Sequence, residues 1–358
     1  MVRAIALLGI LLVHCMQSFH AFHPEPEHLI FPQWLNKLSM IFVGEIIQSK
    51  SFMVFSFLFG MSFFLQMDHA RERGIDYRAR FCWRLLLLFG IGFLHSLFYR
   101  GDILTTFAVV GLLPVFFWNK PTWLVAVFAF ISLAQPLALA SQVFHHTEWS
   151  DALIYHAPKI SYAHDSLPDI LTWNLHHSML SEWSWNLLSG RFFSIVGMFL
   201  TGMLAGRSRI FEGDKQRLIK VSLLGLLLFV TCGTVRLTGI SIPAWIPFSW
   251  FSHLSYVIFF VPFIAWVFSH PELPKWLTKP LSSVGRCTLT CYVTQGIFLS
   301  AFFCDWGLGV HMETTSRLLF GLLFFIFQML CCTWWMQYFK YGPMEGVWRS
   351  LTRIGLKK

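Results

Sequence analysis

Residues 316–338 read SRLLFGLLFFIFQMLCCTWWMQY and carry a single charged side chain, that of Arg317. An apolar run of this length suits a bilayer, whose hydrocarbon core an α-helix crosses in about 20 residues. Comparable runs recur along the chain, at residues 2–20, 49–67, 84–99, 103–118, 122–143, 188–206, 220–240, 249–268, 285–304 and 316–338. The sequence therefore predicts an all-α integral membrane protein, a bundle of about ten transmembrane helices.

The composition favours the same fold class. Hydrophobic residues make up 56% of the 358 residues and charged residues 13%, and the mean hydropathy is +0.59. A soluble domain carries about 25% charged residues, so this chain needs an apolar solvent. We expect a single membrane domain over residues 1–358. We interpret its first apolar stretch as a span, because no small-residue cleavage site of a signal peptide follows it.

The basic residues predict an orientation. The formal net charge is +9, and Lys and Arg concentrate in the links 69–84 and 207–220 and in the tail 339–358. This asymmetry satisfies the positive-inside rule if both termini are cytoplasmic. We therefore expect a multi-pass protein of a bacterial inner membrane, with external segments at about 21–48 and 144–187. The flanking of the spans by Lys and Arg on the cytoplasmic side accounts for the excess positive charge, so no nucleic-acid partner is expected.

Cysteine and histidine patterns indicate neither a disulfide scaffold nor a metal site. Most of the eight cysteines fall inside apolar segments. Cys287 and Cys291 share one helical face, yet no second ligand pair accompanies them. The pairs His145–His146 and His176–His177 are adjacent in sequence, so their members do not share a helical face.

Ionisable residues inside spans are the first candidates for a functional site. Each costs a few kcal/mol to insert, so it usually faces a protein interior or a water-filled cavity. Arg3 and His14 lie eleven residues apart on the first span. At about 100° per residue, eleven residues return a helix to within about 20° of its start after about 16 Å of rise. Both side chains therefore lie on one face.

This spacing suits acid–base chemistry on a charged donor. A cation near the inner end favours a negatively charged molecule entering from the cytoplasm. An imidazole deeper in the span can take a proton from a hydroxyl or an amine near neutral pH. The alternative interpretation is an arginine flanking the span and a histidine packed in the core.

A second group joins the third and fourth spans. His95, Arg100 and Asp102 lie close together in sequence, and a carboxylate can orient a histidine ring and stabilise its imidazolium. The alternative is an interfacial ion pair of Arg100 with Asp102. On the ninth span, Tyr292 and Gln295 contact either a ligand or a neighbouring helix through hydrogen bonds.

Four motifs follow one another along the chain. Arg3 precedes AIALLGILLV, and SFLFG at 56–60 is followed by LHSLFYRGDIL at 94–104. The third motif is VGRCTLTCYVTQ at 284–295, and the fourth is YGPMEGVWR at 341–349. Together they resemble the YeiB-like family, also catalogued as domain of unknown function 418, nearly from end to end.

The resemblance implies an acyltransferase fold and activity. The family is grouped with membrane acyltransferases, including acyltransferase family 3 and the glucosaminide N-acetyltransferases. Those proteins move an acyl group, usually acetyl from cytoplasmic acetyl-CoA, onto an acceptor at the far face. Acyltransferase family 3 carries an Arg, ten residues and then an essential His on its first span, and Arg3 and His14 match that spacing.

One position departs from the family pattern. Many YeiB-like and glucosaminide-type members have Asn where this chain has His14. In the glucosaminide type, the catalytic His lies about eleven residues further on, where this chain has Glu25, with His20, His23 and His28 nearby. His14 is therefore our first candidate for the catalytic base, and His23 is the second.

These observations predict an acetyl-CoA-dependent O- or N-acyltransferase. We expect His14 as base or acyl carrier, supported by His95 and Asp102. The predicted groups around acyl-CoA are Arg3, Arg84, Arg286, Tyr292 and Gln295. The acceptor is a hydroxyl or an amine, on a carbohydrate or amine compound, and the related families are compatible with a homodimer. The alternatives are a transporter or flippase without covalent chemistry, and a non-catalytic membrane partner or sensor.

Overall fold

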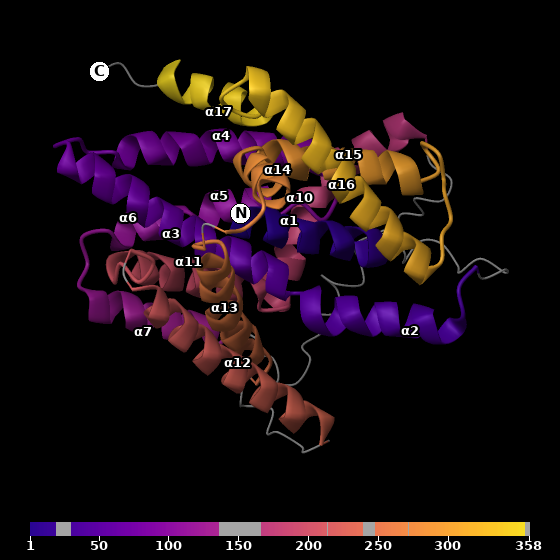
Figure 1. The fold of residues 1–358 in the computed structure, drawn as a ribbon. Helices are drawn as coiled ribbons and strands as arrows, with labels where there is room; N and C mark the ends of the chain where they lie inside the picture. The colour runs from indigo at the N-terminus through magenta and orange to yellow at the C-terminus, as the bar shows by residue number, and fades with distance from the viewer. Residues whose placement is uncertain (19–29, 136–165, 213, 239–247, 271, 355–358) are drawn as a thin grey trace.

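The computed structural model describes residues 1–18, 30–135, 166–212, 214–238, 248–270 and 272–354. Helices dominate these ranges, and no β-strand occurs within them. The predicted all-α class is therefore confirmed for the described part of the chain. Figure 1 shows the helices layered against one another, with the N-terminus near the middle of the view.

Three helical stretches are long and apolar enough to cross a membrane: Gln33–Glu72, Lys215–Arg236 and Thr314–Tyr338. A fourth span results if Leu167–Leu187 and Arg191–Arg207, which meet at an angle of 72°, are counted as one. Shorter apolar helices include Val2–Met16, Leu104–Phe117, Thr122–Leu133, Phe251–Val267 and Thr288–Phe303. These helices indicate a membrane protein, and the count of ten spans stays a prediction.

The described residues form the following elements in chain order. They are α1 (Val2–Val13), the π-helix η1 (His14–Ser18), α2 (Gln33–Ile41), the π-helix η3 (Phe42–Ile47), α3 (Lys50–Glu72), α4 (Arg78–Ser96), α5 (Leu104–Val110), α6 (Leu112–Phe117), α7 (Thr122–Leu133), α10 (Leu167–Leu188), α11 (Arg191–Arg207), α12 (Lys215–Leu237), α13 (Phe248–Val267), α14 (Lys275–Arg286), α15 (Thr288–Phe303), α16 (Thr314–Tyr338) and α17 (Pro343–Ile354).

Glycines bring α3 and α11 into direct backbone contact. A Cβ atom on Gly60 would lie 1.9 Å from the carbonyl oxygen of Phe199, and one on Gly202 would lie 1.9 Å from that of Phe57. Helices in lipid gain little from burying apolar surface against each other, so close packing at small residues stabilises them instead. This seam joins two helices that are distant in sequence and fixes the middle of the molecule.

The helices α12 and α13 form a hairpin that lies at the lower edge of Figure 1. A Cβ atom on Gly225 would lie 2.3 Å from the backbone nitrogen of Phe259, so these helices also touch through their backbones. Val257 and Val261 of α13 pack into an apolar cluster with Met53 and Phe57 of α3. The hairpin therefore joins the rest of the protein mainly through one face of α13.

The predicted external segments contain regular structure. Within 144–187, the described residues form most of α10, and within 21–48 they form α2 and η3. In α10, polar residues repeat every fourth position, at Asn174, Ser178, Glu182 and Asn186, and all four are buried. Because this polar face packs inside the protein, the described part of 144–187 forms a helix and not an open loop.

Candidate functional site

The first helix carries His14 into the interior. α1 buries Ala4, Leu7 and Leu11 on one side, and at His14 the α-helix changes to the π-helix η1. Such π turns are frequent at functional sites. The Nδ1 atom of His14 is buried and has no hydrogen-bond partner among the described residues. A buried polar atom without a partner is costly, so this nitrogen is available for a ligand or water.

A second histidine is fixed by a carboxylate. Nδ1 of His95 lies 2.8 Å from Oδ1 of Asp102, and both side chains are fully buried. The other oxygen, Oδ2, accepts the backbone N–H of Thr105 at 3.1 Å. A neutral imidazole that donates Nδ1–H to this carboxylate carries its lone pair on Nε2. The alternative ion pair does not form, because Arg100 donates to Ser181 instead.

Two tyrosines connect the histidines. The ring of Tyr99 lies 4.7 Å from His14 and 5.8 Å from His95, measured between centroids. The ring of Tyr292 lies 6.1 Å from His14 and 5.2 Å from His95. We call these five residues, His14, His95, Tyr99, Asp102 and Tyr292, the polar centre. It draws on α1–η1, on α4 and the link that follows it, and on α15.

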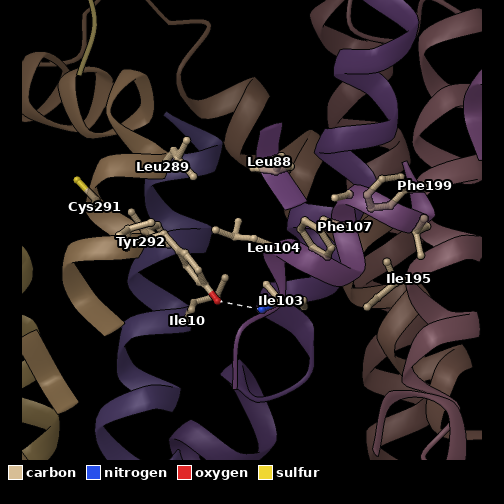
Figure 2. Close-up of a cluster of buried hydrophobic side chains, with 14 of the residues drawn as sticks. Ile10, Leu88, Ile103, Leu104, Phe107, Ile195, Phe199, Leu289, Cys291 and Tyr292 are labelled. Carbon is tan, nitrogen blue, oxygen red and sulfur yellow. Dashed lines mark hydrogen bonds between the residues drawn. The ribbon is translucent and has the colours of Figure 1, made fainter. Parts of the chain in front are cut away.

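Figure 2 shows how one member of this centre, Tyr292, contacts the apolar core. The hydroxyl of Tyr292 reaches across from α15 and accepts the backbone N–H of Ile103 at 3.2 Å. Ile10 of α1 lies beside this bond, and Leu104 lies between it and the core around Phe107. The bond ties α15 to the loop that carries Asp102, so the carboxylate and the tyrosine are positioned together.

A cavity of about 50 Å³ opens beside the polar centre. It has room for one or two water molecules, at about 30 Å³ each. Its polar walls come from His14, Ser49, Ser51, Arg191 and Tyr292, and its apolar walls come from Ile10, Val13, Phe52, Gly101 and Ile103. The cavity fits a small reacting group but is far too small for a whole cofactor.

The polar face of α10 extends this environment. The side-chain amide of Asn186 donates to Thr106 of α5 at 3.0 Å and to Glu182 at 3.1 Å. Glu182 also lies 3.8 Å from the guanidinium of Arg191, which lines the cavity. We did not predict these residues from the sequence as site candidates. The signal was the four-residue repeat of polar positions in α10.

The opposite end of α1 is strongly basic. Arg3 is exposed there and donates to the hydroxyl of Ser62 in α3. Arg84 donates to the side-chain oxygen of Gln66, one turn further along α3, so both guanidinium groups bond to the same helix. Arg84 stacks over the ring of Trp348, 4.4 Å from its centroid, and its carbonyl accepts the indole N–H at 2.9 Å. We call Arg3, Arg84 and Trp348 the basic end.

The link between α3 and α4 lies at the same end. Hydrogen bonds from the Arg78 side chain lower the pKa of Asp76 to about 2, so this carboxylate stays ionised at physiological pH. The pair is exposed to solvent. It neutralises only one of the arginines in this link, and the end remains cationic.

The fourth motif anchors α17 to α15. Glu345 accepts the backbone N–H groups of Leu289 and Thr290, at 2.6 and 3.2 Å, and the Thr290 hydroxyl at 2.6 Å. A carboxylate at the start of a helix satisfies N–H groups that have no partner within the helix. Arg286 donates to the carbonyl of Lys340 at 2.7 Å, close to the same junction. Arg286 therefore ties the C-terminal segment to α14.

The two predicted ligand residues on α15 have different surroundings. Tyr292 lines the cavity, whereas Gln295 is fully buried and donates to Gln328 of α16 at 2.7 Å. His23 lies outside the described residues. Within the residues that the structure describes, no three His, Cys, Asp or Glu side chains gather in a way that could hold a metal ion.

Sequence comparisons give relatives over the whole chain. The family described as "Protein of unknown function (DUF418)" matches residues 205–355. "Uncharacterized protein YxaH" of Bacillus subtilis (strain 168) is 26% identical over 98% of this chain and 92% of its own length. "Uncharacterized protein YeiB" of Escherichia coli (strain K12) is 26% identical over 98% of this chain and 94% of its own length.

A third relative is similar to the same extent. "Uncharacterized 39.9 kDa protein in amylase 3'region" of Bacillus acidopullulyticus is 24% identical over 98% of this chain and 91% of its own length. No solved structure matches the chain.

Proposed function

Since the chain belongs to the YeiB-like family of DUF418 proteins, as its four motifs predict, we propose that it is a membrane acyltransferase. It takes an acyl group, acetyl in the simplest case, from acyl-CoA and transfers it to a hydroxyl or an amine. The names of its relatives assign no activity, so the proposal rests on the residues of this chain.

The observation that carries the proposal is the convergence of His14 with the His95–Asp102 pair. The two imidazoles share Tyr99 and Tyr292 as ring neighbours, and each has one buried nitrogen without a partner among the described residues. Buried histidines that serve only packing satisfy their nitrogens with hydrogen bonds. The open nitrogen of His14, beside a small cavity, instead suits proton transfer to and from a substrate.

His14 is the reacting base in this proposal, because it lines the cavity. Its ring nitrogen takes the proton of the acceptor hydroxyl or amine while the acceptor atom attacks the thioester carbonyl. The C–S bond then breaks, and the CoA thiolate receives the proton from the His14 imidazolium. Arg191 supplies a positive charge at the cavity wall for the oxyanion that forms between these two steps.

His95 and Asp102 are positioning residues. Nε2 of His95 abuts the backbone of α15 at Gly296, where a Cβ atom would lie 2.1 Å away, and His95 does not line the cavity. Asp102 fixes the imidazole ring of His95 through a hydrogen bond, and this ring packs against the ring of Tyr292. This pair therefore holds the cavity wall and its electrostatics without touching the reacting atoms.

The donor enters from the basic end. Arg3 lies on the same helix as His14, about 16 Å away along the axis. Its charge and that of Arg84 suit the phosphates of CoA, and the thioester then reaches toward the cavity. The gathering of Lys and Arg at this end supports an inner-membrane protein with about ten spans and both termini in the cytoplasm. The acceptor, a carbohydrate or an amine compound, then binds at the external side, and a homodimer is compatible with this arrangement.

The test is acetyl transfer from radiolabelled acetyl-CoA by purified protein in proteoliposomes, with a panel of sugars and amines as acceptors. His14→Ala should lower turnover by about 10²–10⁴-fold, the usual contribution of a general base. His270→Ala is the matched control, because His270 is exposed and its side chain hydrogen-bonds only to the carbonyl of Trp266 among the described residues. Full activity in His14→Ala would overturn the assignment.

A transporter is the second candidate, favoured by the break between α10 and α11. These helices meet at 72°, and Arg191 begins α11 beside the cavity. Transporters bind substrates at such broken helices. This alternative predicts substrate movement across vesicles without any consumption of acetyl-CoA, whereas the acyltransferase consumes one acetyl-CoA for each acceptor modified.

A further inference from the structure

A much larger cavity, of about 460 Å³, lies away from the polar centre. It opens where the α12–α13 hairpin meets α3 and α11. Val221 of α12 and Val257 of α13 form one wall, and Phe57 of α3 and Ala205 of α11 form the opposite wall. The lining is almost wholly apolar. The cavity is therefore a pocket for hydrocarbon at the joint between the hairpin and the rest of the protein.

This apolar cavity is costly to leave empty and unfavourable to fill with water. Protein interiors pack as densely as organic crystals, so an empty volume of this size forfeits many van der Waals contacts. A buried water needs two to four polar partners, and these apolar walls do not offer them. An acyl chain satisfies the same walls through dispersion and burial of its methylene groups.

The edge of the cavity carries a fixed positive charge. The guanidinium of Arg207 lines the cavity and donates to the carbonyls of Phe117, Trp118 and Lys120, each at 2.9 Å. It also donates to the hydroxyl of Thr122 at 3.4 Å, so all four of these hydrogen bonds go to neutral oxygens and none neutralises the charge of Arg207. Among the described residues, no carboxylate pairs with Arg207. The phosphate of a lipid headgroup beside the cavity would neutralise the charge of Arg207.

We propose that this cavity binds one acyl chain of an anionic phospholipid whose phosphate lies against the guanidinium of Arg207. Arg207 opens the basic link 207–220, which carries further Lys and Arg residues. The lipid acts as packing material that fixes the hairpin to α3 and α11. The site shares no lining residue with the cavity beside His14.

The proposal is tested by lipid retention, measured by native mass spectrometry on delipidated full-length protein in detergent. Phosphatidylglycerol, phosphatidylcholine and oleate are added separately at equal concentrations. We expect at least tenfold more bound phosphatidylglycerol than phosphatidylcholine. Val221→Trp, which fills the cavity from α12, should lower phosphatidylglycerol binding at least fivefold. Leu224→Trp is the matched control, because Leu224 is 56% exposed on the same helix.

Ala205→Phe fills the cavity from the opposite wall and tests the same site if Val221→Trp does not fold. Normal retention of phosphatidylglycerol by a folded cavity-filling variant would overturn the proposal. Equal binding of phosphatidylcholine would overturn the role of the negative headgroup, and equal binding of oleate would overturn the assignment to a phospholipid. The readout does not involve acetyl transfer, so its failure leaves the proposed enzymatic function untouched.

Discussion

The ionisable side chains at the two ends of α1 differ in their exposure to solvent. At the basic end, Arg3 is exposed, and Arg84 lies over an aromatic ring. At the polar centre, His14 and the His95–Asp102 pair are buried and retain nitrogens without partners. The same helix thus joins a surface that can attract a polyanion to an interior that can move a proton. Under the proposed function, donor binding belongs to the exposed end of α1 and proton transfer belongs to its buried end.

The separation also predicts which substitutions disturb folding. Exposed cations lose little when they are truncated, because solvent replaces their partners. Buried groups leave uncompensated partners behind, which costs several kcal/mol. Variants at the polar centre should therefore affect both stability and turnover, whereas variants at the basic end should affect mainly donor binding.

The largest effect on stability is expected for Asp102→Ala. It removes the acceptor for His95 and for the backbone N–H of Thr105, both buried. Breaking such a buried pair costs about 3–5 kcal/mol. Thermal unfolding in detergent should show a large drop in Tm. Asp102→Asn keeps an acceptor oxygen, so its Tm should lie between those of wild type and Asp102→Ala. Equal Tm values for wild type and both variants would contradict the account.

Gly296→Ala should have the next largest effect. Its Cβ atom would lie 2.1 Å from Nε2 of His95, so the ring must move away from Tyr292. Overpacking of this kind costs about 1–3 kcal/mol, and acetyl transfer should fall with it. Gly233→Ala on α12 is the control, because a Cβ atom there meets nothing within 4 Å. If both variants transferred acetyl as wild type does, His95 would have no positioning role.

The sequence predicts the local features of this comparison well. The short separation of His95 from Asp102 allows one link to bring them together, whereas the shared face of Arg3 and His14 on α1 stays a prediction from helix geometry. Both depend on residues close in sequence, where helix geometry alone decides the outcome. The acceptor group and the donor cannot be read from such spacing.

Features that depend on distant residues could not be predicted. Gln295 meets Gln328 on the next helix, and Glu345 meets the start of α15 across more than fifty residues. The buried face of α10 was also missed, because tryptophans and leucines between its polar positions obscure the four-residue repeat. Each requires knowing which helices pack together, and sequence spacing within one element does not contain that information.

The smallest expected effect is that of Glu345→Ala, which tests the anchoring of α17 at the basic end. The carboxylate caps the first N–H groups of α15, and losing such a cap costs about 0.5–2 kcal/mol. We expect a small drop in Tm with acetyl transfer nearly retained. Glu345→Gln keeps an acceptor oxygen and serves as the control. Complete loss of transfer in Glu345→Ala at unchanged Tm would instead place this residue at the reacting atoms.

The separation of binding from chemistry is tested most directly by the shift in Tm that acetyl-CoA produces. A ligand that binds the native state raises its Tm, and the shift grows with the logarithm of ligand concentration over Kd once the site is nearly saturated. We predict that wild type and His14→Ala show the same shift, although only wild type transfers acetyl, and that Arg3→Gln loses most of the shift. A full shift in Arg3→Gln, or none in His14→Ala, would contradict the assignment of donor binding to one end of α1 and proton transfer to the other.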